Sequence, residues 1–106
     1  MKTQIKFNKF QKSIIERANV LTKHNFEPRI TFAGDEHVLL SLPVICENRK
    51  ALHFIEFTKT SKSTAVAKSY YEFTDDNTTI AAPIPVLKNN TLLQIKNTDG
   101  VYKLNF

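Results

Sequence analysis

Hydrophobic residues recur every three or four positions in the first quarter of the chain, and this spacing predicts an amphipathic helix over residues 8–24. Asn8 stands at the N-cap position with Gln11 three residues later, a pair that is typical of a capping box. Pro28 ends the segment, because proline disfavours helical geometry in the residue before it. The apolar positions that share one arc of this helix are Phe10, Ile14, Ile15, Ala18 and Leu21.

Beyond Pro28 apolar and polar residues alternate, and this period of two predicts β-strands. A further short strand before the helix would bury Ile5 and Phe7. Connections this short favour antiparallel pairing, and Asp99-Gly100 between two alternating runs is a strong hairpin signal. The expected strands are residues 3–7, 29–33, 37–46, 51–58, 65–74, 79–87, 91–96 and 101–106.

These elements predict a single α+β domain over residues 1–106, in which one N-terminal amphipathic helix packs on a curved, mostly antiparallel sheet of about six to eight strands. Eight strands would span about 33 Å at ~4.8 Å per strand, whereas a helix is about 10 Å across. One helix cannot cover such a face if the sheet is flat. We therefore expect the sheet to curl around the helix, to split into two layers, or to leave an apolar face open for a partner.

Pro83 and Pro85 are two residues apart, so in an extended segment their missing N–H groups would face the same side. That side cannot join a ladder of hydrogen bonds, which predicts an edge strand protected from further pairing. A proline-rich docking peptide is the alternative, although the spacing and the apolar neighbours favour the edge strand.

Two similar runs, FIEFT and YYEFT, flank a segment that contains lysines. Period-two patterning places Phe54 and Tyr70 on the face opposite to the apolar residues that alternate with them. Aromatic rings that stack on bases, beside lysines such as Lys59 and Lys62 that meet phosphates, are components of a single-strand binding surface. Alternatively, both rings pack in a second layer and the lysines are solvated. The glutamate in each run counts against phosphate contact.

The net charge of +5 is concentrated in the first 30 residues, which hold seven Lys and Arg side chains against two Glu side chains. The rest of the chain balances eight positive and eight negative side chains. An electrostatic partner is therefore expected near the N-terminal helix. The candidate nucleic-acid-binding residues are Lys6, Lys9, Lys12, Lys23, Arg29, Lys59, Lys62 and Tyr70.

Candidate chemistry is sparse. Gly34 and Gly100 are the two glycines, too few for a glycine-rich phosphate loop, and the three histidines and Cys46 lack the short spacing of metal sites. We therefore expect no enzyme activity, no cofactor and no metal. No apolar run approaches the ~20 residues that span a bilayer, and the N-terminal segment lacks the apolar centre of a secretory signal. A cytoplasmic location without membrane contact is expected.

The sequence thus favours a noncatalytic module that binds nucleic acid through its basic N-terminal helix region, and it does not distinguish single from double strands. The alternative is a protein-binding inhibitor or adaptor of phage or mobile-element type, for example an anti-defence protein, acting on an acidic host protein through Phe54 and Tyr70. Nine asparagines, nine isoleucines and twelve lysines beside two glycines suit the AT-rich genome of such an element.

Overall fold

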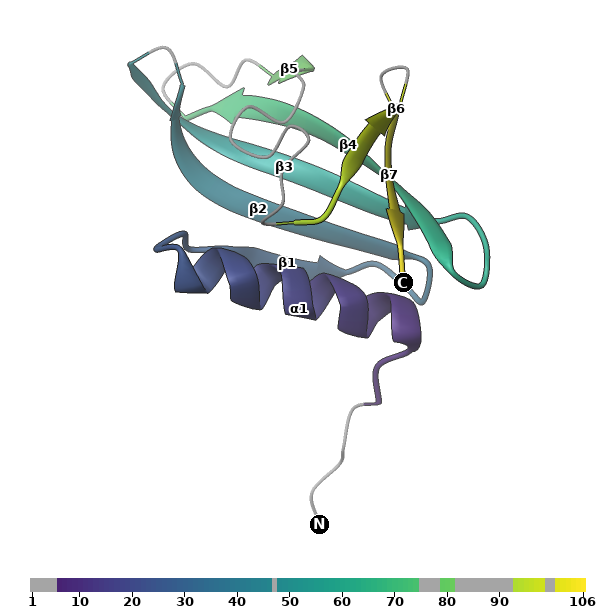
Figure 1. Ribbon diagram of the computed structural model, residues 1–106. Helices are drawn as coiled ribbons and strands as arrows, with labels where there is room; N and C mark the ends of the chain where they lie inside the picture. The colour runs from purple at the N-terminus through teal and green to yellow at the C-terminus, as the bar shows by residue number, and fades with distance from the viewer. Residues whose placement is uncertain (1–5, 47, 75–78, 82–92, 99–100) are drawn as a thin grey trace.

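The computed structural model describes residues 6–46, 48–74, 79–81, 93–98 and 101–106. One helix lies along one face of an antiparallel sheet (Figure 1), so the predicted α+β class with a helix packed on an antiparallel sheet is confirmed. The elements are α1 (Lys9–Lys23), β1 (Arg29–Phe32), β2 (His37–Cys46), β3 (Arg49–Lys59), β4 (Thr64–Phe73), β5 (Thr79–Ala81), β6 (Lys96–Thr98) and β7 (Val101–Asn105).

The helix begins at the predicted cap. The side-chain oxygen of Asn8 accepts a hydrogen bond from the Gln11 N–H at 2.8 Å, and the Gln11 side chain accepts one from the Asn8 N–H at 2.9 Å. This is the predicted capping box. Asn8 Nδ2 also donates to the Asp35 carbonyl at 2.9 Å, which ties the start of α1 to the turn between β1 and β2. The predicted apolar face is confirmed, since the buried side chains include Phe10, Ile14, Ala18 and Leu21.

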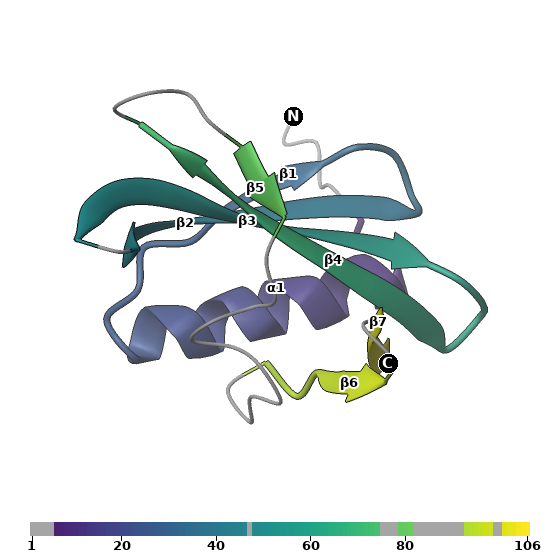
Figure 2. The same ribbon diagram turned by 90° about the horizontal axis from the view of Figure 1, so that it is seen from above.

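The long strands β2, β3 and β4 form the centre of the sheet, and each pairs antiparallel with the next. The strand order in the described residues is β1-β2-β3-β4-β7-β6. The second edge of β4 is divided between two partners, because β7 pairs with residues 64–67 and β5 pairs with residues 70–72. This division brings β7 back beside the first half of β4, and Figure 2 shows β6 and β7 next to the N-terminal half of α1.

The core lies between α1 and the side of the sheet that faces it. Alternate residues of the central strands supply that side, as the period of two predicts, and Leu93 and Ile95 join them just before β6. The largest fully buried apolar side chains of the described residues are Phe10, Ile14, Leu21, Leu40, Leu42, Ile55, Phe57, Phe73 and Leu93.

Pro43 lies where β2 extends beyond β1. The His37 carbonyl accepts from the Ala33 N–H at 3.0 Å, so the odd-numbered residues of β2 direct their backbone groups toward β1. Pairing with β1 ends at Arg29, opposite Ser41. Pro43 is the next position whose N–H would face this edge, and it has none. The proline therefore removes no ladder hydrogen bond and protects the open part of the edge from a further strand.

The strand predicted at residues 3–7 is wrong where the structure describes it, because Lys6 and Phe7 are outside any strand. The Phe7 ring instead packs on Phe32, with the ring centroids 5.0 Å apart. The aromatic residue is thus held by side-chain packing at the edge of the core, for which no backbone pairing is required. Ile5 lies outside the described residues.

The strand predicted at residues 91–96 is also wrong at residues 93–95, whereas Lys96 lies in a strand. Leu93 and Gln94 form a turn, and Gln94 has a φ of 53°, which no regular strand accommodates. β6 follows at Lys96–Thr98 and pairs antiparallel with β7, with Thr98 opposite Val101, so the strand pairing that the Asp99-Gly100 signal predicted is confirmed. β5 begins at residue 79 as predicted, and the edge strand predicted at residues 83–85 lies outside the described residues.

Candidate nucleic-acid interface

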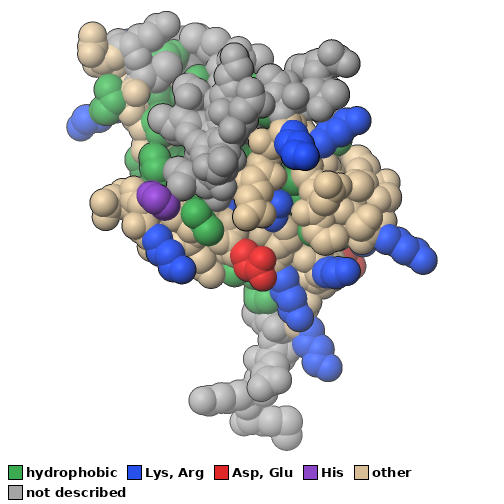
Figure 3. Space-filling model, in the orientation of Figure 1, with side chains coloured by type: hydrophobic (Ala, Val, Ile, Leu, Met, Phe, Trp, Pro, Cys, Tyr) green, Lys and Arg blue, Asp and Glu red, His purple; other side chains and the backbone are tan. Residues whose placement is uncertain are grey.

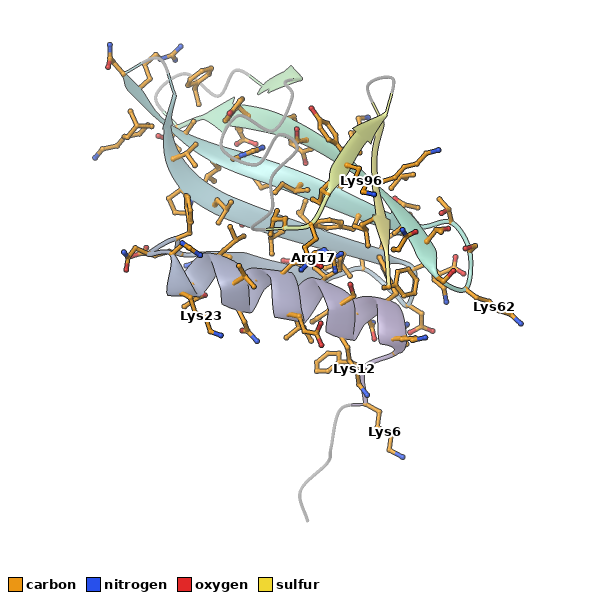
Figure 4. All side chains as sticks on the ribbon, viewed as in Figure 1. Lys6, Lys12, Arg17, Lys23, Lys62 and Lys96 are labelled. Carbon is orange, nitrogen blue, oxygen red and sulfur yellow. The ribbon has the colours of Figure 1, made fainter. Side chains whose placement is uncertain are left out.

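The lysines predicted to bind nucleic acid separate into two groups at opposite ends of α1. Lys12 and Lys23 both point away from the sheet (Figure 4). Lys9 and Lys23, the first and last residues of α1, are about 21 Å apart at 1.5 Å per residue. Of the predicted residues, exposed Lys6, Lys12 and Lys62 lie on the side where α1 begins. Exposed Lys9, the first residue of α1, and half-buried Lys59, the last residue of β3, belong to the same side, whereas Lys23 and Arg29 lie at the other end. Figure 3 shows Lys and Arg side chains gathered along the right-hand side, where α1 begins.

The C-terminal end of β7 connects this end of α1 to the loop between β3 and β4. The loop spans residues 60–63 and is closed by a hydrogen bond from the Thr60 N–H to the Thr64 carbonyl at 2.9 Å. The Phe106 N–H donates to the Ser63 carbonyl at 2.8 Å, and the Phe106 ring packs on Phe10 of α1 at 5.4 Å between centroids. The loop that carries Lys62 is therefore held next to the start of the helix through Phe106.

A groove of about 300 Å³ lies between α1 and the end of β7, and we call it the α1–β7 groove. Two of the predicted lysines, Lys9 and Lys12, line it, together with residues that the sequence did not indicate. The complete lining of the groove is Lys9, Lys12, Ser13, Glu16 and Arg17 of α1 with Gln94, Asn105 and Phe106.

Arg17 is a buried residue of α1 that links the helix to the other segments lining the groove. Its Nε donates to the Leu93 carbonyl at 2.7 Å, its Nη1 to the carbonyl and hydroxyl oxygens of Ser13, and its Nη2 to the Asn105 carbonyl at 3.4 Å. Burial lowers the pKa of Arg17 from its ordinary value, and the charge of Glu16 acts in the opposite direction. Because these N–H groups are engaged by the protein itself, Lys9 and Lys12 are the exposed cations on the groove wall.

Sequence reasoning missed Arg17 as a structural residue, although a local signal existed. Arg17 lies seven residues after Phe10, three after Ile14 and four before Leu21, which is the spacing of the buried face of the helix. A charged residue on that face indicates a buried hydrogen-bonding role. Phe106 had no comparable signal, because its packing partner is 96 positions away.

The structure brings Phe54 and Tyr70 together and leaves them far from the helix lysines. The two residues are directly opposite across β3 and β4, with rings stacked at 5.0 Å and 22°. They occupy the face of the sheet away from α1, since Ile55 and Tyr71, which alternate with them, are buried. Phe54 is five residues from Lys59, or about 17 Å along the strand.

The surroundings of Tyr70 are acidic. Its hydroxyl donates to Glu56 Oε1 at 3.4 Å. The pKa of Tyr70 is raised first by desolvation, then by the charge of Glu56 and its hydrogen bond, and further by the charge of Glu72. The two carboxylates beside the ring repel phosphate, which counts against nucleic-acid contact at this face.

The opposite end of α1 carries a different concave surface. A pocket of about 580 Å³ has Arg29 in its lining, with Glu27 beside it and with apolar Phe26, Pro43 and Leu52. A carboxylate next to the arginine offsets its attraction for phosphate. Within the described ranges, no group of three His, Cys, Asp or Glu side chains is placed to hold a metal ion.

No protein-family model, curated protein or solved structure matches this chain. Among the described residues no helix is both long and apolar enough to cross a membrane.

Proposed function

We propose that this protein is a noncatalytic nucleic-acid-binding module whose contact surface is the end of the molecule where α1 begins. The observation that carries the proposal is that the predicted residues Lys9 and Lys12 line one groove, at the end to which the Lys62 loop is joined through Phe106. Exposed lysines grouped around a concave surface attract phosphates and release counterions on binding.

The charge distribution supports the same end. Lys6, Lys9 and Lys12 are all exposed and fall within seven residues of one another, while Glu16 is the first acidic residue of the chain. We further propose that the sheet has six to eight strands and curves toward α1. Such curvature would keep the Lys62 loop beside these lysines.

The test is a titration of labelled single- and double-stranded oligonucleotides over a range of salt concentrations. Affinity should fall steeply with salt, and the variant with Lys9→Glu and Lys12→Glu should bind much more weakly, with the salt slope smaller by about 2. This variant should remain folded, because α1 has no acidic residue in its first turn and glutamate there interacts favourably with the helix dipole.

The matched control is Lys23→Glu with Lys50→Glu, which makes the same change in net charge away from the start of α1. Both lysines are exposed. The control variant should keep most of the affinity. Equal losses in the two variants would show that only total charge matters, and no binding by the unchanged protein at low salt would eliminate the proposal.

A second candidate function is a protein-binding inhibitor or adaptor of phage or mobile-element type that acts on an acidic host protein. The stacked, half-buried pair of Phe54 and Tyr70 on the face away from α1 favours it. Central aromatic residues supply most of the affinity at many protein interfaces. The basic helix would then mainly accelerate encounter.

These two functions predict opposite results for one pair of variants. If the protein is an inhibitor or adaptor, a host protein recovered from nuclease-treated lysate should still bind the Lys9→Glu, Lys12→Glu variant. The same host protein should not bind the Phe54→Ala, Tyr70→Ala variant. A nucleic-acid binder should show the reverse pattern with an oligonucleotide. Recovery that is unchanged in the folded aromatic variant would remove the second candidate.

A further inference from the structure

We infer that the α1–β7 groove takes one unpaired nucleotide of a single strand, with its base against Phe106 and the adjoining phosphate at Lys9 and Lys12. This inference rests on the proposed function and narrows its ligand to single-stranded nucleic acid. The sequence placed the base-stacking role on Tyr70, whereas the structure offers Phe106 for it, next to lysines and at the opposite side of the sheet.

Phe106 is an aromatic wall held in position by three contacts. Its backbone N–H is bound to the Ser63 carbonyl at 2.8 Å, its ring packs against Phe10 with an interplanar angle of 51°, and Asn105 before it is hydrogen-bonded to Arg17. The ring is half-buried and part of the groove lining, so some of its surface is left for a ligand. A ring that is already ordered loses little conformational entropy when a base stacks on it.

The charges in the groove give a bound nucleotide a direction. Lys9 and Lys12 lie at the start of α1, and Glu16 follows Lys12 by one helical turn. A phosphate is therefore attracted to the lysine end and repelled from the Glu16 end. Arg17 is 8% exposed, so its positive charge under the groove is screened little by salt and adds to the attraction without a direct contact.

Neutral polar side chains complete the lining. The amides of Gln94 and Asn105 both expose a donor and an acceptor, and both residues are exposed. Amides of this kind hydrogen-bond to the edges of bases, which are available when the base is unpaired. Lysine, aromatic ring and amide are thus adjacent in a groove of about 300 Å³.

A duplex cannot use this arrangement. Its bases are stacked on both faces and paired along their edges, so neither Phe106 nor the amides would find a free partner, and only phosphate contact with lysines would remain. We therefore expect single strands to bind more tightly than duplexes of equal length at the same salt concentration.

The first test compares oligo-dT with a hairpin duplex in the unchanged protein and in Phe106→Leu, which keeps an apolar contact with Phe10. Phe106→Leu should weaken oligo-dT binding roughly 5- to 150-fold, the range for one lost base stack, and leave duplex binding within about twofold. The inference is overturned if the unchanged protein prefers the duplex or binds both equally, or if Phe106→Leu keeps its affinity for oligo-dT. Oligonucleotide binding together with one of these results would leave the proposed function standing.

The second test uses the absence of tryptophan from the chain. Phe106→Trp introduces a single fluorescent reporter, and oligo-dT should quench it as the base stacks on the indole. Phe26→Trp, in the pocket at the opposite end of α1, is the matched control and should not be quenched. Equal quenching of both reporters would overturn the inference. Quenching of Phe106→Trp by thymidine monophosphate at the same nucleotide concentration would also overturn it, because that result would indicate a site for a free mononucleotide.

Discussion

His53 is a fully buried titratable residue in the centre of the sheet. Neither of its ring nitrogens has a hydrogen-bond partner among the described residues. It lies between Leu42 and Tyr71 across the sheet, and its ring packs against that of Tyr71 with the centroids 4.7 Å apart and the rings tilted by 33°. Desolvation lowers the pKa of His53 from 6.5 to about 4. The folded protein therefore keeps His53 neutral at pH values where the unfolded chain binds a proton.

This pKa difference predicts that stability falls as the pH drops from 6.5 toward 4. Below the unfolded pKa the unfolded state takes up the proton first, so His53 should cost about 2 kcal/mol of unfolding free energy between pH 7 and pH 5. Urea unfolding of the wild-type protein and of His53→Leu at both pH values measures this. The leucine variant should lose less stability than the wild type over this interval, and equal losses would contradict the prediction.

Among the elements, α1 depends on Arg17 for its attachment to the C-terminal strands. The guanidinium joins the helix to Leu93 and Asn105 across 76 and 88 residues of sequence. Arg17→Leu should therefore lower the unfolding free energy by about 3 kcal/mol, because hydrogen bonds to a charged group are lost and the buried Leu93 carbonyl loses this partner. Lysine cannot replace the forked geometry, so Arg17→Lys should recover only part of this loss.

Chemical denaturation of the two variants checks this attachment. Lys23→Leu is the control, since it removes an exposed cation from the same helix and should change stability by less than about 1 kcal/mol. Equal denaturation midpoints for Arg17→Leu and the control would show that α1 is held by its apolar face alone.

For the whole molecule, binding at the α1–β7 groove should stabilise the fold, since the groove is built from α1 and β7 together and is absent from the unfolded chain. Oligo-dT at 100 times its Kd should add about 2.7 kcal/mol and raise Tm by roughly 10 °C or more for a domain of this size. Differential scanning fluorimetry at low salt measures the shift. The Lys9→Glu, Lys12→Glu variant should show no comparable rise at the same concentration, and a shift of equal size in that variant would contradict the assignment to this groove.

The sequence by itself determined the parts of the fold that depend on near neighbours. The capping box of Asn8 and Gln11, the apolar face of α1 and the bounds of β2 were all predicted, because a cap, a helical face and a period of two are set by residues within a few positions of one another. Even the buried Arg17 could have been found from its position on the helix face. The strand predicted at residues 3–7 was wrong because Phe7 is held by side-chain packing against Phe32 and not by backbone pairing with another strand.

Only the tertiary structure decided which candidate residues meet. The pairing of β7 with the first half of β4 brings Phe106 to Ser63 and to α1, and the alternation of β3 and β4 sends Tyr70 to the opposite face. Strand order follows from the burial of the whole core, which no local pattern encodes. The sequence therefore located the charge near the start of α1, while the fold determined that an aromatic residue nearly a hundred positions away lies beside it.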